Sequence, residues 1–267
     1  MSMNNKTGVT IENHLLDSVY LKRTVKVDCY LPASAVDVEI SLLLINDGQD
    51  LVTMEFQNIL EQLQEVITPL FCVGLHCSAD RRMEYGTAAI ADYKGRGAKA
   101  EFYTKFVMEE LLPYLRKTYQ VMSFKEKAFA GFSLGGLSAM DIVWNHPAEF
   151  SNAGIFSGSF WWRDKDQAAE DFDENEDRIM HRLVRQGGYY PWLKFFFEVG
   201  TQDETADRNN NGIIDAIDDT ISLIAELQTK GYTNGAISYL ELEDGRHDVP
   251  TWARAFPEYL KWGWGLH

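Results

Sequence analysis

The sequence predicts a single-domain α/β fold with a mostly parallel central sheet and helices on both of its faces. Short, nearly continuous apolar runs recur along the chain, as expected for strands that are covered on both faces. Stretches with apolar residues at helical spacing separate several of these runs. Strands that alternate with helices imply parallel strands joined by crossover connections. The chain has 267 residues, of which 45% are hydrophobic, so one core of this kind can be filled.

Two kinds of strand are expected. Residues 25–30 alternate apolar and polar side chains, which predicts a half-exposed strand near an edge of the sheet. The other runs are apolar almost throughout and predict interior strands, after which ligand-binding loops are expected. These runs are 41–45, 70–75, 128–130, 153–156 and 195–199, and a further strand-like segment covers 237–242.

The expected helices each show one apolar face. Helical spacing relates Phe102 to Phe106, and a final helix is expected at 251–262. Two longer stripes consist of Phe56, Ile59, Leu60, Leu63, Val66 and Ile67 and of Ile217, Ile221 and Ile224. Residues 164–177 are densely acidic, so residues 163–190 are expected to form a lid or a surface excursion within a single domain, 1–267.

Composition excludes several classes of partner. Lys and Arg total 25 and Asp and Glu total 40, which gives a formal net charge of −15. Such a charge repels nucleic acid and anionic lipid surfaces. The first residues carry no apolar run of signal-peptide length, and no stretch approaches the ~20 apolar residues of a membrane span. We therefore expect a cytoplasmic protein with no nucleic-acid or membrane partner, whose cysteines, Cys29, Cys72 and Cys77, remain reduced.

A nucleophile motif follows the expected strand 128–130. The segment Gly131-Phe132-Ser133-Leu134-Gly135 fits G-x-S-x-G and opens a helical stretch, which is the context of the nucleophile elbow in α/β-hydrolase sheets. Small residues two positions before and after the serine avoid a clash in this tight turn, and the helix N-terminus favours developing negative charge. Ser133 is therefore predicted to be the nucleophile. The alternative is a glycine-rich turn with an incidental serine.

A serine hydroxyl is a poor nucleophile and needs a general base within hydrogen-bond reach. In this fold the chain order is serine, acid, histidine. Of the histidines after Ser133, His181 lies in a helical pattern and His267 ends the chain. His247 lies instead in a loop between a strand-like segment and the final helix. His247 is therefore the predicted base.

The acid that orients the histidine is sought after the apolar run 195–199. That run ends in Gly200-Thr201-Gln202-Asp203-Glu204, at the expected carboxyl end of a strand. Asp203 is the predicted acid. Glu204 and Asp207 are close enough in sequence to take the same role.

The segment after the predicted acid fits a twelve-residue calcium loop. Residues 207–218 place oxygen-bearing side chains at positions 1, 3, 5, 9 and 12 and a glycine at position 6. The alternative is an Asn-rich turn, because Asn-Gly is a strong turn signal. We predict a structural Ca²⁺ and no organic cofactor. The predicted ligands are Asp207, Asn209, Asn211, the carbonyl of Ile213, Asp215 and Asp218.

Several short segments match one family in the same order along the chain. Besides the elbow, they are Asn46-Asp47-Gly48-Gln49, Arg82-Met83-Glu84-Tyr85, Ser157-Gly158-Ser159-Phe160-Trp161-Trp162, Gly200-Thr201-Gln202-Asp203 and Gly245-Arg246-His247-Asp248. Together they resemble the putative-esterase family of α/β-hydrolases, the group that includes enterochelin esterase and esterase D. The resemblance implies an α/β-hydrolase fold and a serine esterase that acts on a small-molecule ester. It also implies that the backbone N–H groups of Leu134 and Gln49 hold the oxyanion.

Three side chains, Trp161, Trp162 and Arg82, are candidates for lining the substrate pocket. Adjacent tryptophans also serve ordinary packing, and Arg82 and Glu84 also suit a loop salt bridge. Three alternatives to a triad esterase stay open. Some siderophore esterases of this branch use a Ser-His pair without an acid. The others are an acyltransferase on the same scaffold and a catalytically idle, calcium-dependent binding module.

Overall fold

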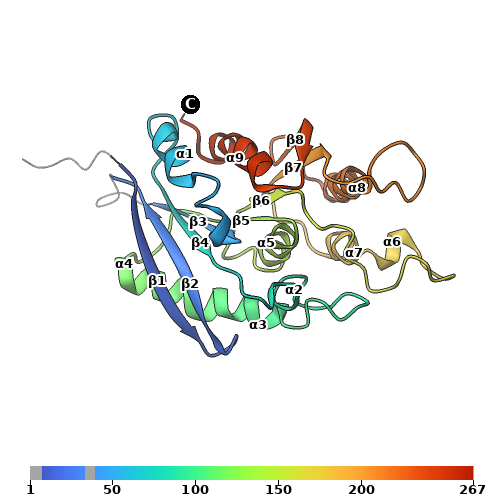
Figure 1. Cartoon of the computed structure of the whole chain (residues 1–267), viewed down its shortest axis with the longest axis horizontal. Helices are drawn as coiled ribbons and strands as arrows, with labels where there is room; N and C mark the ends of the chain where they lie inside the picture. Colours follow the sequence, from blue (N-terminus) through green and yellow to red (C-terminus); the bar gives the residue numbers. More distant parts are fainter. Residues whose placement is uncertain (1–7, 34–39, 267) are drawn as a thin grey trace, which may run out of the picture.

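The computed structural model describes residues 8–33 and 40–266, and their strands form a sheet flanked by helices (Figure 1). The strands β1 to β8 span Thr10–Ser18, Arg23–Leu31, Ser41–Asn46, Leu70–Leu75, Lys127–Phe132, Asn152–Phe156, Lys194–Gln202 and Ile237–Arg246. Their order in the sheet is β1-β2-β4-β3-β5-β6-β7-β8. β1 and β2 pair antiparallel, as do β2 and β4, and every other pair is parallel. The predicted α/β architecture with a mostly parallel sheet is therefore confirmed.

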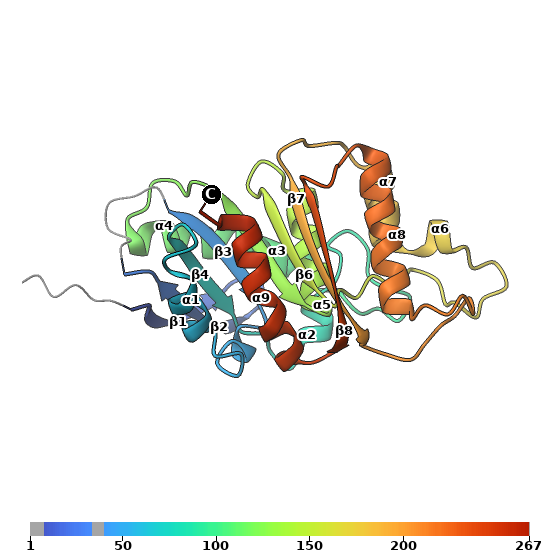
Figure 2. The same ribbon diagram turned by 90° about the horizontal axis from the view of Figure 1, so that it is seen from above.

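Helices cover both faces of the sheet (Figure 2). One face carries α1 (Phe56–Leu63) and α9 (Val249–Trp264). The opposite face carries α3 (Ala100–Lys105), η2 (Phe106–Leu111), α4 (Leu112–Tyr119), α5 (Leu134–Asn145), α7 (Ile179–Gln186) and α8 (Asp215–Lys230). Three single turns lie in loops: η1 (Gly48–Asp50), α2 (Arg81–Glu84) and α6 (Glu174–Asp177).

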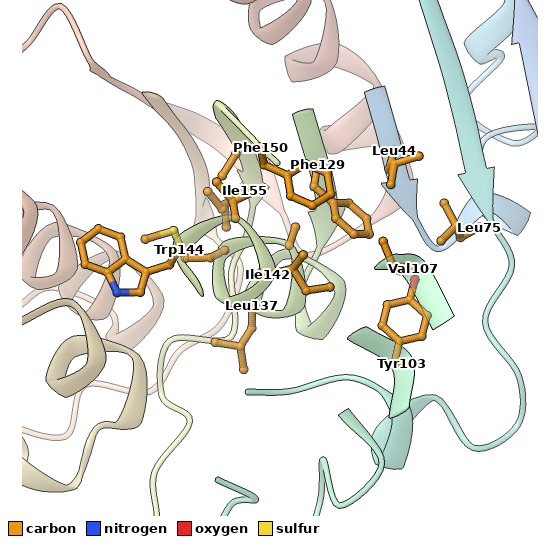
Figure 3. Packing of buried hydrophobic residues seen from close by; sticks show 14 of the residues in the cluster. Leu44, Leu75, Tyr103, Val107, Phe129, Leu137, Ile142, Trp144, Phe150 and Ile155 are labelled. Atoms are coloured by element: carbon orange, nitrogen blue, oxygen red, sulfur yellow. The ribbon is translucent and has the colours of Figure 1, made fainter. Parts of the chain in front are cut away.

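α5 lies in the middle of the larger hydrophobic core (Figure 3). Every residue of this helix from Leu134 to Trp144 is buried. The ring of Trp144 lies 6.3 Å from that of Phe195 in β7, between ring centroids. Each fully buried large apolar side chain contributes about 1.5–3 kcal/mol, so the helix is firmly fixed against the sheet. The turn that precedes α5 is therefore held in place from its C-terminal side.

An aromatic cluster holds α9 against the other face. Phe256 of α9 stacks on Phe156 of β6, with ring centroids 4.9 Å apart. Tyr259 of α9 meets the same Phe156 ring edge-on at 5.9 Å. Phe132 of β5 lies 6.1 Å from Phe256 and completes the cluster. These contacts fix the start of α9, and the loop before it, relative to the end of β5.

Some details differ from the sequence prediction. The sequence predicts no strand at β1, which is mostly exposed and therefore lacks a clear alternating pattern. α1 ends at Leu63, so Val66 lies beyond the helix and is exposed. Phe102 and Ile221 are also exposed rather than part of buried faces. The buried positions of α8 are Ile217, Asp219, Thr220, Leu223, Ile224 and Leu227.

Residues 163–190 contain α6 and α7 and lie beside α8 (Figure 1). Arg178, between α6 and α7, donates from Nη1 to a carboxylate oxygen of Asp219 in α8 at 2.8 Å. His181 of α7 lies 2.9 Å from the hydroxyl of Ser222, between Nε2 and Oγ. Burial lowers the pKa of His181 well below its usual range, so its ring is a neutral packing group. These contacts fasten α7 to α8.

No helix within residues 8–33 and 40–266 is long and apolar enough to cross a membrane. Cys29 in β2 and Cys72 in β4 are buried, and Cys77 is half-buried after β4. All three are free thiols, as the sequence predicts. His267 lies outside the described residues.

Candidate active site

Ser133 occupies a strained turn between β5 and α5. Its φ of 55° and ψ of −121° lie in a region that residues with a Cβ rarely adopt. A Cβ on Gly131 would come within 2.3 Å of the carbonyl oxygen of Gly135. A Cβ on Gly135 would come within 2.6 Å of a carboxylate oxygen of Asp47. Both glycines are therefore required by close packing, as expected for a nucleophile elbow.

The Ser133 hydroxyl faces a second serine. Its Oγ lies 3.3 Å from Oγ of Ser159, and the Ser159 N–H donates to the Ser133 carbonyl at 3.2 Å. In the described part of the chain, no hydrogen bond joins Ser133 to His247. The structure therefore places Ser159, which the sequence pointed to only as part of a family segment, next to the nucleophile.

His247 and Asp203 come together at the carboxyl ends of β7 and β8. His247 Nδ1 lies 3.8 Å from Oδ2 of Asp203, which is longer than a hydrogen bond. The Asp203 carboxylate folds back over β7, because a Cβ on Gly200 would come within 2.7 Å of its Oδ1. The same Cβ would come within 2.3 Å of the carbonyl carbon of Gly245 in β8. A glycine at position 200 thus lets both strand ends and the carboxylate share this space.

Trp252 of α9 connects the histidine loop to the nucleophile strand. Its ring stacks on Phe132, the residue before the nucleophile, with centroids 5.0 Å apart. It meets the His247 ring edge-on at 5.4 Å. Its indole N–H donates to Oγ of Ser157 at 2.9 Å. Ser133, which follows Phe132, and His247 therefore belong to one connected region, through a tryptophan that the sequence prediction missed.

The predicted oxyanion loop is tied to the same strand by Arg81. Arg81 Nε and Nη2 each donate to one carboxylate oxygen of Asp47, both at 2.7 Å. Nη2 also donates to the carbonyl of Phe132 at 3.2 Å. Leu134 begins α5, so its N–H has no acceptor within the helix and is free to bind an anion. Gln49 lies in η1, two residues after Asp47.

The three predicted pocket residues have different environments. Trp162 is fully buried, and a Cβ on Gly86 would meet its ring at 2.7 Å, so this tryptophan is part of the core. Trp161 is half-buried and lies under the guanidinium of Arg96, whose Cζ is 4.7 Å from its ring centroid. Arg82 is exposed.

Glu84 does not pair with Arg82 in the described structure. It is buried and accepts two hydrogen bonds from Arg23, at 2.8 and 2.7 Å. Arg81, one residue before the predicted Arg82, bonds Asp47 and the carbonyl of Phe132 beside the nucleophile. Nothing in the sequence around these two arginines distinguishes Arg81 from Arg82.

The segment 207–218 has the turns expected of its sequence. Asp207 accepts from the backbone N–H groups of Asn211 and Gly212, at 3.1 and 2.9 Å. Gly212 has a φ of 85°. Asp215 lies 3.2 Å from Arg208, between Oδ1 and Nη1. Among the described residues, no three His, Cys, Asp or Glu side chains lie close enough to hold a metal ion.

The remaining predicted ligands bond within the same loop. The Asn209 side chain accepts from the N–H of Asn211 at 3.1 Å, and its amide donates to Asp218 at 3.0 Å. The N–H of Ile213 donates to Asn211 at 2.8 Å. Arg208 places a positive charge beside two carboxylates of this loop, Asp215 and Asp218. The predicted Ca²⁺ stays a prediction.

Comparison with known proteins identifies the family. The family described as Putative esterase matches residues 18–262. The chain belongs to this family. The prediction of an esterase of the enterochelin-esterase type is thereby confirmed at family level. An uncharacterised protein of Bacillus subtilis, YbbA, is 22% identical to this esterase over 232 residues, which cover 83% of this chain and 84% of that protein. The iron(III) enterobactin esterase of Dickeya dadantii is 33% identical over 102 residues, 36% of this chain and 23% of that one.

Solved structures agree on the fold. The enterobactin esterase of Shigella flexneri superimposes with a TM-score of 0.71 at 19% identity, and the match covers 94% of this esterase and 57% of that chain. The siderophore hydrolase EstB of Aspergillus nidulans gives a TM-score of 0.67 at 16% identity, over 97% and 95% of the two chains. The esterase thus spans little more than half the length of the Shigella enzyme. The predicted α/β-hydrolase fold is confirmed.

Proposed function

We propose that this esterase hydrolyses a small-molecule carboxylic ester through an acyl-enzyme on Ser133, with His247 as general base and Asp203 as the acid that orients it. The observation that carries the proposal is the strained backbone of Ser133 at the N-terminus of a fully buried helix. Such strain persists only where the surrounding structure enforces it, and it exposes the hydroxyl to a substrate. The 3.8 Å approach of His247 to Asp203 supports the other two roles.

The reaction follows from these positions. Ser133 Oγ attacks the ester carbonyl while His247 takes the hydroxyl proton, and the tetrahedral intermediate places its negative charge near the N–H groups of Leu134 and Gln49. His247 returns the proton to the leaving alcohol as the C–O bond breaks. Water then attacks the acyl-enzyme, gives its proton to His247, and releases the acid as the proton returns to Ser133. The His247 ring must move toward Ser133 for the first step, since catalytic hydrogen bonds often tighten only with substrate bound.

The half-buried ring of Trp161 favours an ester that carries an aromatic group. Trp161 lies two residues after Ser159, whose hydroxyl is 3.3 Å from that of Ser133. Arg96 covers its ring as a cation–π partner, at 4.7 Å. The guanidinium of Arg96 is itself paired with the buried carboxylate of Asp92, so the recognition surface is the ring of Trp161, which suits an aromatic acid or phenol. The similarity to the Shigella flexneri enterobactin esterase, whose structure was solved in the presence of 2,3-di-hydroxy-N-benzoyl-serine, supports the same substrate class.

Labelling with a fluorophosphonate probe tests the proposal. We expect the wild-type protein to be labelled on Ser133 and Ser133→Ala to remain unlabelled, because only an activated serine reacts readily. Ser238→Ala, in β8, is the matched control and should be labelled like the wild type. A panel of aryl, acetyl-sugar and siderophore esters then ranks substrates. Equal labelling of Ser133→Ala and wild type would reject the mechanism.

We further infer a structural Ca²⁺ in loop 207–218 and a cytoplasmic location, both as hypotheses. The loop supplies five oxygen-bearing side chains and the turns described above. Three free thiols suit a reducing compartment. Calorimetric titration with calcium tests the first hypothesis. Cell fractionation with an antibody to the chain would decide the location.

A further inference from the structure

A second buried carboxyl lies near the proposed acid. Glu198 is in β7, and only 1% of it is exposed. Within the described residues, neither of its carboxyl oxygens has a hydrogen-bond partner. Its main chain is fully engaged, since its carbonyl accepts from the N–H of Ser157 at 2.8 Å. A buried acid without a donor strongly disfavours its charged form.

Glu198 and the carboxylate of Asp203 share one face of β7. Side chains two residues apart on a strand point to the same side, so Glu198 and position 200 face the same way. The Asp203 carboxylate fills the space above position 200, within 2.7 Å of where a Gly200 Cβ would lie. The Asp203 side chain is also 1% exposed, and neither of its oxygens has a hydrogen-bond partner among the described residues. The two carboxyls therefore lie toward the same face of β7, and neither has a hydrogen-bond partner in the described structure.

The other charged and titratable groups near Glu198 do not neutralise it. The positive charge of Arg254 in α9 lowers the pKa of Glu198, but the Arg254 guanidinium itself donates to Asp244 at 2.6 and 3.0 Å. Tyr239 of β8 is the neighbouring phenol; burial and its hydrogen bond to Glu241 raise its pKa, and the charge of Glu198 adds a smaller contribution. Burial raises the pKa of Glu198 to about 8, and the negative charge of Asp203 adds to this rise.

We propose that Glu198 and Asp203 form a coupled carboxyl pair that holds one proton and one negative charge at neutral pH, with Glu198 as a positioning residue that keeps the proton. Two carboxyls on the same face of a strand, both shielded from water, cannot both ionise cheaply. The protonated Glu198 offers an O–H donor on the face where Asp203 lacks one.

The pair would act on catalysis through Asp203. A donor from Glu198, direct or through a water molecule, would hold the Asp203 carboxylate in the orientation that faces His247. It would also leave a single negative charge to stabilise the imidazolium that forms during attack. Ionisation of Glu198 at higher pH would add a second charge and withdraw the donor. The catalytic part of the inference rests on the proposed function; the shared proton does not.

The shared proton is tested by carbon NMR of protein labelled at the glutamate carboxyl carbon. The Glu198 signal is assigned by its loss in Glu198→Gln. We expect it to stay protonated near pH 7 and to titrate near pH 8. Asp203→Asn should move this titration to lower pH, because the neighbouring negative charge is removed. A titration in the ordinary carboxyl range, or one that Asp203→Asn leaves in place, would overturn the pair.

The positioning role is tested by kinetics on the ester that the panel selects. Glu198→Leu removes the donor and should lower kcat about tenfold with little change in KM, the usual effect of losing one hydrogen bond to a charged group. Glu198→Gln keeps an N–H donor and should restore at least about a third of kcat. It should also abolish the kinetic ionisation near pH 8. Wild-type kcat in Glu198→Leu, or persistence of that ionisation in Glu198→Gln, contradicts the role.

Failure of this inference is distinguishable from failure of the proposed function. Absence of fluorophosphonate labelling and of any ester hydrolysis in the wild type would reject the function and with it the positioning role. The carboxyl pair would then be accepted or rejected by the NMR titrations alone. If Glu198→Leu does not fold, the Glu198→Gln pH profile decides the positioning role.

Discussion

His247 Nδ1 lies 3.8 Å from Oδ2 of Asp203, and the two side chains differ sharply in exposure, 39% against 1%. The proposed acid is enclosed by the ends of β7 and β8, whereas the proposed base stands in a loop that solvent reaches. A fixed acid beside an accessible base suits a histidine that must turn toward a substrate and back.

Removal of the nucleophile or of the base should abolish hydrolysis. We expect Ser133→Ala and His247→Ala each to lower kcat by a factor on the order of 10⁴, and the double variant to be little worse, because the residues act as a unit. Initial rates with the selected aryl ester measure this. More than a tenth of wild-type activity in Ser133→Ala would place the nucleophile elsewhere.

Asp203→Asn should keep the fold and lose activity through a misoriented imidazole. We expect kcat to fall by at least about a hundredfold while KM stays similar, since the amide cannot balance the imidazolium charge. Glu204→Gln is the comparison, and Asp207→Asn is a second one in the same segment. An unaffected rate in Asp203→Asn would favour a Ser-His pair, and a loss in either comparison would move the acid role there.

Arg81→Lys should weaken the oxyanion loop. Arg81 bonds both oxygens of Asp47 and the carbonyl of Phe132, which a lysine cannot do at once. We expect kcat to drop about tenfold, the cost of a lost charged hydrogen bond, with a smaller change in KM. The matched control is Arg82→Lys, an exposed neighbour that should behave like the wild type. Equal rates in the two variants would contradict a role for Arg81.

Glu198→Gln should be more stable than the wild type, by an amount that grows as the pH rises. The pKa of Glu198 is raised from 4.5 to about 8 in the folded state, so the folded protein binds more protons than the unfolded chain between these values. The free energy of unfolding of the wild type therefore falls with pH across this window, by up to about 1.4 kcal/mol per pH unit from this group. Urea unfolding at several pH values measures the difference, which should be smallest near pH 4.5 and level off above pH 8. A difference independent of pH would contradict the raised pKa.

Calcium should stabilise the protein if loop 207–218 binds it. A ligand that binds only the folded state adds about 2.7 kcal/mol at a hundredfold excess over Kd, so Tm should rise with calcium and fall with EDTA. Asp207→Ala with Asp215→Ala should remove the response. Arg208→Met is a useful companion, because it frees Asp215 and Asp218 from a competing cation and should tighten binding. Calorimetry that detects no binding at millimolar calcium would reduce the segment to an Asn-Gly turn.

Much of the fold could be predicted because its interior strands appear in the sequence as apolar runs. β3 to β7 are buried along nearly their whole length and read as apolar runs, and the predicted residues Gln49, Ser133 and Asp203 follow such runs. The strand β1 was not predicted, because most of its side chains face solvent. The segment Phe195-Phe196-Phe197-Glu198-Val199 did carry a signal, namely a charged residue inside a buried run.

Other parts of the candidate site depend on contacts between distant segments. Trp252 bonds Ser157, 95 residues earlier, and Arg81 bonds Asp47, 34 residues earlier. Nothing in the local pattern around these residues distinguishes them from their neighbours. Which of two adjacent arginines or tryptophans faces the site is decided by helix phase and tertiary packing. These choices become visible only when the chain is folded.

The complete burial of α5 from Leu134 to Trp144 limits where this esterase can diversify. Almost any change of size in that helix would open a cavity or overpack the core, at a cost comparable to a large part of a domain's net stability. New substrate preferences, in nature or in a laboratory library, must therefore arise elsewhere. The segments that remain open to variation are the loops around Arg96 and Trp161 and the largely exposed residues 164–176. Libraries confined to them should yield altered specificity with far fewer unfolded clones than libraries in α5.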